Sequence, residues 1–280
     1  LNGADPVLAE GLIPVEIDET GKVTRANPAS EWYSYKEKRW ANAVILNDKN
    51  IEYKYKEEIP ESNIESYFVW IPKYSYQIWD LGEYENLTSI DESKVHEIPI
   101  KFGLENTSDE NAGECTTPMT SGATGNCKIG DYMTSPAFIT MGTNGLWVGK
   151  FETGYKGATS TTAAQVNASD STKIQIKPNV YSWRNIQLAN AHLASYNYKR
   201  EYDSHMMKNT EWGAVAYLQH SKYGSAASVR LNNNSAYITG YAAVSEPTCG
   251  YTLDNRGCNI QESTSLGADG TYTINYLNPN

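Results

Sequence analysis

Hydrophobic and polar residues alternate along the first part of the chain, and this period of two predicts strands. Residues 11–18 (GLIPVEID) form a short strand, residues 18–22 a turn, and residues 23–28 lead out again. Residues 32–46 also alternate, around the polar stretch 35–40 (YKEKRW), which predicts two strands joined by a hairpin turn. The first 65 residues therefore form an extended, β-rich N-terminal arm with a hairpin.

An aromatic run at residues 67–79 predicts a further strand after a turn or one helical turn at residues 60–65. Pro72 removes a backbone donor inside this run, so we expect the strand to break or bulge there. Tyr74, Tyr76 and Ile78 then share one face of its second half. Residues 94–103 (KVHEIPIKFG) are predicted to pair with it as the next strand.

The middle of the chain carries a strong hairpin signal, with apolar residues at 138–141 and 146–151 flanking Thr143, Asn144 and Gly145. Residues 173–180 predict one more strand, and the final residues a turn followed by a terminal strand. Two loops separate these elements. We expect an insertion at residues 105–135, rich in Gly, Thr, Ser and Asn, and an exposed loop at residues 157–173 with few bulky apolar side chains.

Two segments have the period of an amphipathic helix. In the first, Ser182 is an N-cap residue, and Ile186, Ala189 and Leu193 fall on one stripe. The second helix begins near Asn209 or Thr210 and ends by Gly224. Its expected apolar face is Trp212, Val215, Ala216 and Gln219.

Four cysteines occur as two local couples inside polar loops, and we expect disulfides between Cys115 and Cys127 and between Cys249 and Cys258. Three connectivities remain open from the sequence. Neither couple has the spacing of a zinc knuckle, and the four histidines lie elsewhere. Disulfides would favour an extracellular setting.

The composition of the chain makes some classes of binding partner unlikely. The net charge of −10 disfavours nucleic acid, and no apolar run is long enough to span a membrane. The 21 tyrosines are typical of strands and loops that are exposed to solvent on one side and apolar on the other. The chain does not begin with methionine, which suggests that something N-terminal was removed. Four Asn-x-Ser/Thr sequons begin at Asn86, Asn106, Asn167 and Asn233, and in so polar a chain we interpret them as ordinary loop sequence.

Several residues are candidates for binding. Trp70, Tyr74, Tyr76 and Trp79 could form a platform for sugars, although we interpret them as core and sheet-edge residues. For Trp147, Trp183 and Trp212 we also expect core packing. His205, close to Asp203, is interpreted as a hydrogen-bonded structural histidine rather than a metal ligand. We expect no resident metal or cofactor, and calcium at Asp254, Asn255, Asp269 and Asn275 is a weaker hypothesis beside ordinary turns.

The segments GLWVGKFETG, YSWRNIQLANAH and NTEWGAVAYL occur in an order that resembles the formylglycine-generating-enzyme (sulfatase-modifying factor) branch of the C-type-lectin-like fold. The resemblance covers residues 137–225. It implies an α+β domain over residues 66–280, with two helices and twisted antiparallel sheets. The branch carries its reactive cysteines after a Gly-Asn-Val-Trp-Glu-Trp-like element, which does not occur here, so no catalytic residue carries over and we expect no enzyme activity.

Almost end to end, the chain is similar to a group of surface proteins of gut Firmicutes and their phages, through phrases such as ESYFVWIPKYSYQIW and DSHMMKNTEWGAVAYLQHSKYG. Members often follow a prepilin-like membrane segment, which implies display on a cell or virion surface. We therefore expect a non-enzymatic extracellular structural protein that self-associates through strand edges and the N-terminal arm. The alternative is a lectin-like adhesin for glycans or host proteins.

Overall fold

The computed structural model of this chain describes residues 5–76, 98–103, 132–141 and 143–224, together with the backbone of two strands, β11 and β12. Two compact units are present, Leu1–Ala227 and Ser228–Asn280. In the second unit, β11 (Thr264–Leu266) pairs antiparallel with β12 (Tyr272–Ile274), and β12 lies where the sequence predicts a terminal strand.

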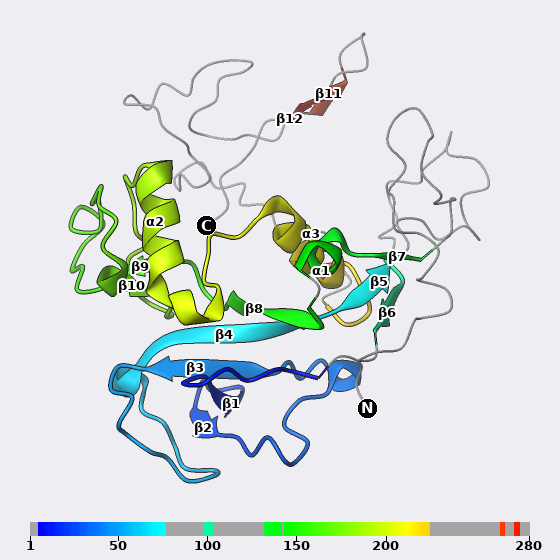
Figure 1. Cartoon of the computed structure of the whole chain (residues 1–280), viewed down its shortest axis with the longest axis horizontal. Coiled ribbons are helices and arrows are strands. Elements are labelled where there is room, and N and C mark those ends of the chain that lie inside the picture. The colour runs from blue at the N-terminus through cyan, green and yellow to red at the C-terminus, as the bar shows by residue number, and fades with distance from the viewer. Residues whose placement is uncertain are drawn as a thin grey trace. The chain divides into compact units, whose positions relative to one another are not determined.

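The larger unit is built around a five-stranded antiparallel sheet with strand order β2-β1-β3-β4-β8 (Figure 1). Its strands are β1 (Ile13–Ile17), β2 (Val23–Arg25), β3 (Asn42–Leu46), β4 (Ile64–Pro72) and β8 (Gly145–Gly149). The first three come from the expected N-terminal arm, so this region shares one sheet with the rest of the unit. The β1–β2 hairpin is confirmed, with Glu16 opposite Thr24.

A second sheet continues from the end of β4. Its order is β6-β5-β7, with β5 (Tyr74–Tyr76) between β6 (Ile100–Phe102) and β7 (Met133–Thr134). The break at Pro72 and the pairing of residues 100–102 with the aromatic run are both as predicted. A two-stranded sheet of β9 (Gly154–Tyr155) and β10 (Ile174–Gln175) completes the β-structure of this unit's described part.

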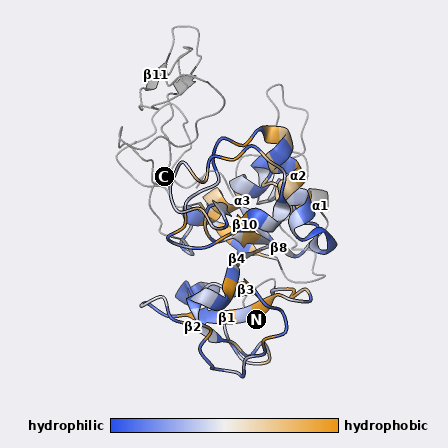
Figure 2. Cartoon of the chain, turned by 90° about the vertical axis from the view of Figure 1, so that its left-hand side faces the viewer, coloured by the Kyte–Doolittle hydropathy of each residue, from blue (hydrophilic) through white to orange (hydrophobic). Residues whose placement is uncertain are grey.

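Three helices lie beyond β8, on the side away from β1 and β2 (Figures 1 and 2). They are α1 (Pro136–Met141), α2 (Leu188–Tyr198) and α3 (Asn209–Gln219). Together with the antiparallel sheets they make the chain a mixed α+β protein, as expected. Hydrophobic and hydrophilic residues are interspersed along α2 in Figure 2, so this helix has no broad apolar face.

Helix α1 corrects the predicted hairpin. Residues 138–141 are helical, and β8 pairs with β4 instead. Pro136 stands at the first helical position, where a missing N–H removes no bond. Ala137 and Phe138 are both buried, and they pack against Tyr74 of β5. Tertiary burial of Phe138 therefore decides the local structure.

Both long helices bury a different face from the predicted one. In α2, Leu193 is 44% exposed and Ala194 is buried in its place. In α3, Trp212 is 57% exposed, and the buried positions are Glu211, Ala214 and Leu218. The buried stripe of α3 is thus displaced by about one residue, which turns it by roughly 100° around the helix.

The helix starts also differ. Ser182 does not cap α2: its hydroxyl donates to Glu152 at 2.7 Å, and the helix begins six residues later. Asn167, from the loop at residues 157–173, accepts a hydrogen bond from the backbone N–H of Gln187 at 2.9 Å. That loop is mostly exposed, as expected, but Ala164 within it is fully buried.

A partly buried polar cluster connects the end of α2 to the start of β4. The Tyr198 hydroxyl donates to Glu65 at 2.9 Å and lies 2.7 Å from the Ser66 hydroxyl oxygen. Lys156 pairs with the same carboxylate at 3.1 Å. Burial, and then the charge of Glu65, raise the pKa of the Tyr198 phenol, so it stays a neutral donor.

Gly145 provides a test of the packing between β4 and β8. A Cβ atom there would lie 2.3 Å from the Trp70 ring and 2.6 Å from the Ile71 carbonyl oxygen. We expect Gly145→Ala to lower the free energy of unfolding by about 1–3 kcal/mol, measured by urea denaturation, because the ring must move. The control is Gly213→Ala in α3, where nothing lies within 4 Å. It should raise stability by about 1 kcal/mol, and equal effects of the two changes would contradict the packing.

Candidate functional site at the edge of β8

The hydrogen bonds between β4 and β8 follow a fixed alternation. Lys150 N donates to Tyr67 O at 2.9 Å, and Lys73 N donates to Asn144 O at 2.7 Å. In an antiparallel ladder, only every second residue directs its backbone groups toward the neighbouring strand. These two bonds flank β8 and therefore fix which of its residues face β4.

Leu146 and Val148 belong to the set that faces β4. The backbone N–H and C=O groups of Gly145, Trp147 and Gly149 consequently point away from the sheet. No residue of the described ranges pairs with them. We call this outer side of β8, with its backbone donors and acceptors, the β8 edge.

The opposite end strand of the sheet, β2, and the first part of β4 do have backbone partners. On the far side of the sheet, Arg25 of β2 donates its backbone N–H to Glu57 at 2.9 Å, and Ile59 donates to Val23 at 2.9 Å. Beside β4, Tyr67 N donates to Ile176 O at 2.9 Å. Within the part of the chain that the structure describes, β8 is thus an end strand whose outer side pairs with no other strand, although Gly145 at its start is buried.

One N-terminal segment, residues 5–10, lies beside β8 without joining any sheet. The Trp147 indole N–H donates to the Val7 carbonyl at 2.7 Å, and the Tyr33 hydroxyl donates to Asp5. Leu8 packs against the buried cluster that includes Trp70. The Val7 side chain is 61% exposed, so the segment covers β8 only lightly.

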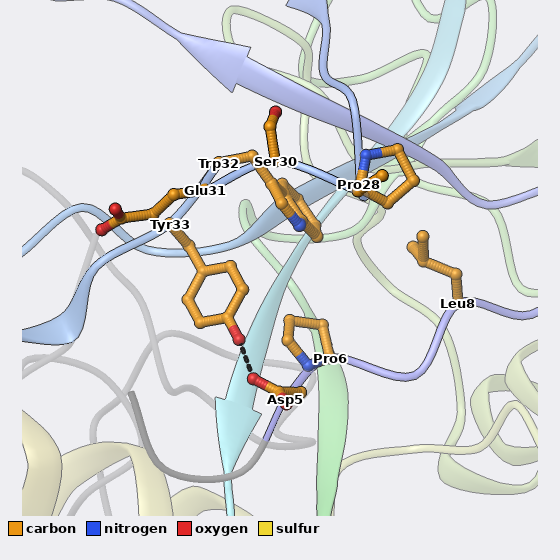
Figure 3. A pocket seen from close by; sticks show the side chains of 9 residues that line it. Asp5, Pro6, Leu8, Pro28, Ser30, Glu31, Trp32 and Tyr33 are labelled. Atoms are coloured by element: carbon orange, nitrogen blue, oxygen red, sulfur yellow. Dashed lines mark hydrogen bonds between the residues drawn. The ribbon is translucent and has the colours of Figure 1, made fainter. Parts of the chain in front are cut away.

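A hollow of about 320 Å³ remains between this segment and residues 28–33 (Figure 3). Pro6, Leu8 and Pro28 form apolar walls, and the Trp32 ring lies between them. The hollow shows that residues 5–8 do not fill the space against which they rest.

Three of the four aromatic residues that could have formed a sugar platform are buried. Trp70 is 3% exposed, Tyr74 0% and Tyr76 3%. A buried ring presents no face to a sugar, and these three pack in the core, which is the other interpretation of their pattern. Trp79 lies outside the described residues.

The three motif tryptophans have different environments. Trp147 and Trp183 are half-buried, and the Trp183 indole donates to Val166 O at 2.6 Å. Trp212, expected in the core, is exposed because α3 is turned toward Glu211. Trp147 contacts Trp70 edge to face, with ring centroids 5.3 Å apart.

His205 is a structural histidine held between two acceptors. Its Nδ1 lies 2.5 Å from the Asp203 carbonyl oxygen, and its Nε2 lies 2.8 Å from a carboxylate oxygen of Glu211. Glu211 also accepts the backbone N–H of Lys208 at 2.7 Å, which closes the first turn of α3. Since a carbonyl and a carboxylate both accept, the doubly protonated imidazolium fits this site best.

The remaining candidates lie outside the described residues. These are the cysteines Cys115, Cys127, Cys249 and Cys258, the calcium candidates Asp254, Asn255, Asp269 and Asn275, and the sequons at Asn86, Asn106 and Asn233. Over the described ranges, no group of three His, Cys, Asp or Glu residues could hold a metal ion, and none of the helices described there is long and apolar enough to cross a membrane.

Comparison with protein-family models, with curated proteins and with solved structures finds no match for this chain. The β8 edge is therefore argued from its geometry. The GLWVG segment allows strand β8 to be predicted from the sequence. The expected hairpin, however, pairs residues 138–141 with one side of this strand. Only the pairing with β4 reveals which side of β8 has no paired strand among the described residues.

His205 should make stability depend on pH. Burial is the largest single influence and lowers its pKa, but the bonds to Glu211 and Asp203 and the Glu211 charge together raise it above 6.5. A histidine whose pKa is higher in the folded than in the unfolded state stabilises the fold fully at pH values below its unfolded-state pKa. This stabilisation is lost as the pH rises through the folded-state pKa. We expect the free energy of unfolding to fall as the pH rises from 6 through the folded-state pKa of His205. Urea denaturation at each pH measures this change.

The controls remove each partner. His205→Gln and Glu211→Gln should both flatten this pH dependence, because neither variant keeps the imidazolium–carboxylate pair. An unchanged slope in His205→Gln would show that another group carries the effect.

Trp147 should hold residues 5–10 in place. Trp147→Phe keeps an aromatic ring against Trp70 and removes the donor to Val7, a loss of about 1 kcal/mol for one hydrogen bond. We expect proteolysis within residues 5–10 to become several-fold faster, measured by mass spectrometry of the released fragment. Tyr55→Phe is the matched control, since the exposed Tyr55 lies on another loop. Equal cleavage rates in both variants would contradict the assigned role of the indole.

Proposed function

We propose that this chain is a non-enzymatic, extracellular structural and interaction protein, a subunit of a surface appendage such as a pilus-like filament, or of a virion. It assembles with other copies through strand edges and its N-terminal residues. The observation that carries the proposal is the β8 edge, where the backbone groups of three consecutive alternate residues have no partner among the described residues.

Strand edges favour association for a general reason. Unpaired N–H and C=O groups accept a further strand readily, and proteins that do not use an edge protect it with charges, prolines or bulges. The β8 sequence GLWVG contains no charged residue and no proline, and residues 5–10 lie beside it. Its neighbours Leu146 and Val148 pack against the cluster around Phe138, so the edge is also flanked by apolar side chains.

We further propose that residues 66–280 form a C-type-lectin-like module. Its support is the order of elements: β8 carries the GLWVG motif, α2 follows the Ser182-Trp183 element, and α3 begins beside Glu211-Trp212. The mixed α+β architecture and antiparallel sheets agree with such a module. A glycan-binding adhesin is favoured by no described residue, because three of the four candidate aromatics are buried.

The direct test is mass per particle, by light scattering and negative-stain microscopy of material isolated without denaturant. We expect concentration-dependent growth into filaments or closed oligomers. A monomer at every concentration would overturn the proposal. Binding on a glycan array by such a monomer would replace it with the adhesin function.

A further inference from the structure

We propose that the hollow between residues 5–8 and residues 28–33, which we call the Trp32 hollow, binds a proline-rich peptide segment with a neighbouring basic residue. The inference goes beyond the proposed assembly, because it names a different surface and a partner of different chemistry. It rests on the walls of the hollow, on one indole N–H without an acceptor, and on the charge at the rim.

One wall of the Trp32 hollow is a closed turn. Pro28 is the second residue of this turn, a position that favours proline. The Ser30 backbone N–H and the Ser30 hydroxyl both donate to Asn27 O at 3.0 Å. The turn therefore presents the Pro28 ring to the hollow in a fixed position (Figure 3).

The opposite wall is Pro6, whose two neighbours are both tethered. The Tyr33 hydroxyl donates to Asp5. The Trp147 indole N–H donates to Val7 O at 2.7 Å. With both walls held, the hollow of about 320 Å³ is preformed, and its size lies at the lower end of the range of about 300–1,000 Å³ that is usual for ligand pockets.

Trp32 places a hydrogen-bond donor in this hollow. Its side chain is 4% exposed, and Figure 3 shows the ring nitrogen on the side of the ring that faces Pro6. Among the described residues, no acceptor pairs with the indole N–H, and the nitrogen is not one of the atoms closed off from solvent. Because the polar groups of buried side chains are normally paired, this N–H favours a ligand oxygen.

The other polar side chains within the hollow are already engaged as donors. The Tyr33 hydroxyl donates to Asp5, and the Ser30 hydroxyl donates to Asn27 O. The hollow thus suits a carbonyl that has no N–H beside it. The tertiary amide before a proline has this property, and the carbonyls of a polyproline II segment make no internal hydrogen bonds. Grooves lined by aromatic residues bind such segments.

The rim adds a preference for a basic residue. Asp5 and Glu31 both line the hollow, and both are exposed. Glu31 has a partner in Arg39 at 3.6 Å, whereas Asp5 pairs with no cation of the described residues. An arginine beside the bound proline can therefore pair with the Asp5 carboxylate.

The first test is isothermal titration calorimetry of the full chain with short blocked peptides. The probe is acetylated and amidated Pro-Pro-Arg-Pro-Pro. One control peptide replaces its prolines by alanine, and the other replaces its arginine by glutamate. We expect saturable binding of the probe and a Kd about fivefold or more higher for each control, because the first adds N–H groups without acceptors and the second is repelled by Asp5.

The second test compares variants of the chain. Trp32→Phe keeps an aromatic ring and removes the indole N–H, so the Kd of the probe should rise about fivefold to tenfold. Trp212→Phe is the matched control, since the exposed Trp212 lies on α3, and it should leave the Kd unchanged. Unfolding midpoints show whether both variants fold.

Asp5→Asn keeps the test decisive even if Trp32→Phe fails to fold. The position is exposed, and asparagine still provides an oxygen for the Tyr33 hydroxyl. We expect this variant to lose the preference for the arginine peptide over the glutamate peptide, because the charge that distinguishes them is gone.

The outcomes separate this inference from the proposed assembly. No binding of the probe, equal binding of the alanine peptide, or an unchanged preference in Asp5→Asn would each overturn the inference and leave assembly untouched. Binding of a glycan that Trp32→Phe abolishes, without binding of the probe, would also overturn it and would assign the hollow to a sugar. Binding of the probe by a chain that stays monomeric would support the inference and overturn the proposed assembly.

Discussion

The larger unit depends on β4 forming hydrogen bonds along both of its sides. Trp70 N donates to Ala41 O on the β3 side at 3.0 Å, and Tyr67 O accepts from Lys150 N on the β8 side. Alternation along this one strand fixes which residues of β3 and β8 are paired. It also explains Pro72: that position faces β3, where the missing N–H ends the ladder and the chain departs as β5.

Much of the β-structure could be predicted because its signals are local. The β1–β2 hairpin, the turn at residues 61–63 and the interruption at Pro72 each depend on residues within a few positions of one another. The pairing of β5 with β6 was also predicted, although 23 residues lie between Tyr76 and Ile100. In that case the shared alternation of apolar residues was a sufficient guide.

The errors arise where distant contacts override local pattern. Residues 138–141 have a strand-like composition, but Phe138 is buried against Tyr74 as part of a helix. In α3, the carboxylate of Glu211 is drawn inward by His205 and the Lys208 backbone, and this turns Trp212 outward. A hydropathy scale assigns Glu to the surface and Trp to the core, so it gives the opposite face. The β8 edge could not be predicted from the sequence for a similar reason. Whether a strand is paired on one side or on both depends on residues that are far away in the chain.

Asn167 links the start of α2 to the loop at residues 157–173. Its side-chain oxygen accepts from the Gln187 backbone at 2.9 Å and from the Asn190 amide at 2.9 Å. The first turn of α2 therefore receives its cap from a residue twenty positions upstream, and no residue of the helix itself supplies one. Because this cap is distant in the sequence, the start of helix α2 is stabilised only when the loop is in place. The loop can tolerate insertions at its exposed tip, but its length between Asn167 and Gln187 is fixed by the helix that it starts.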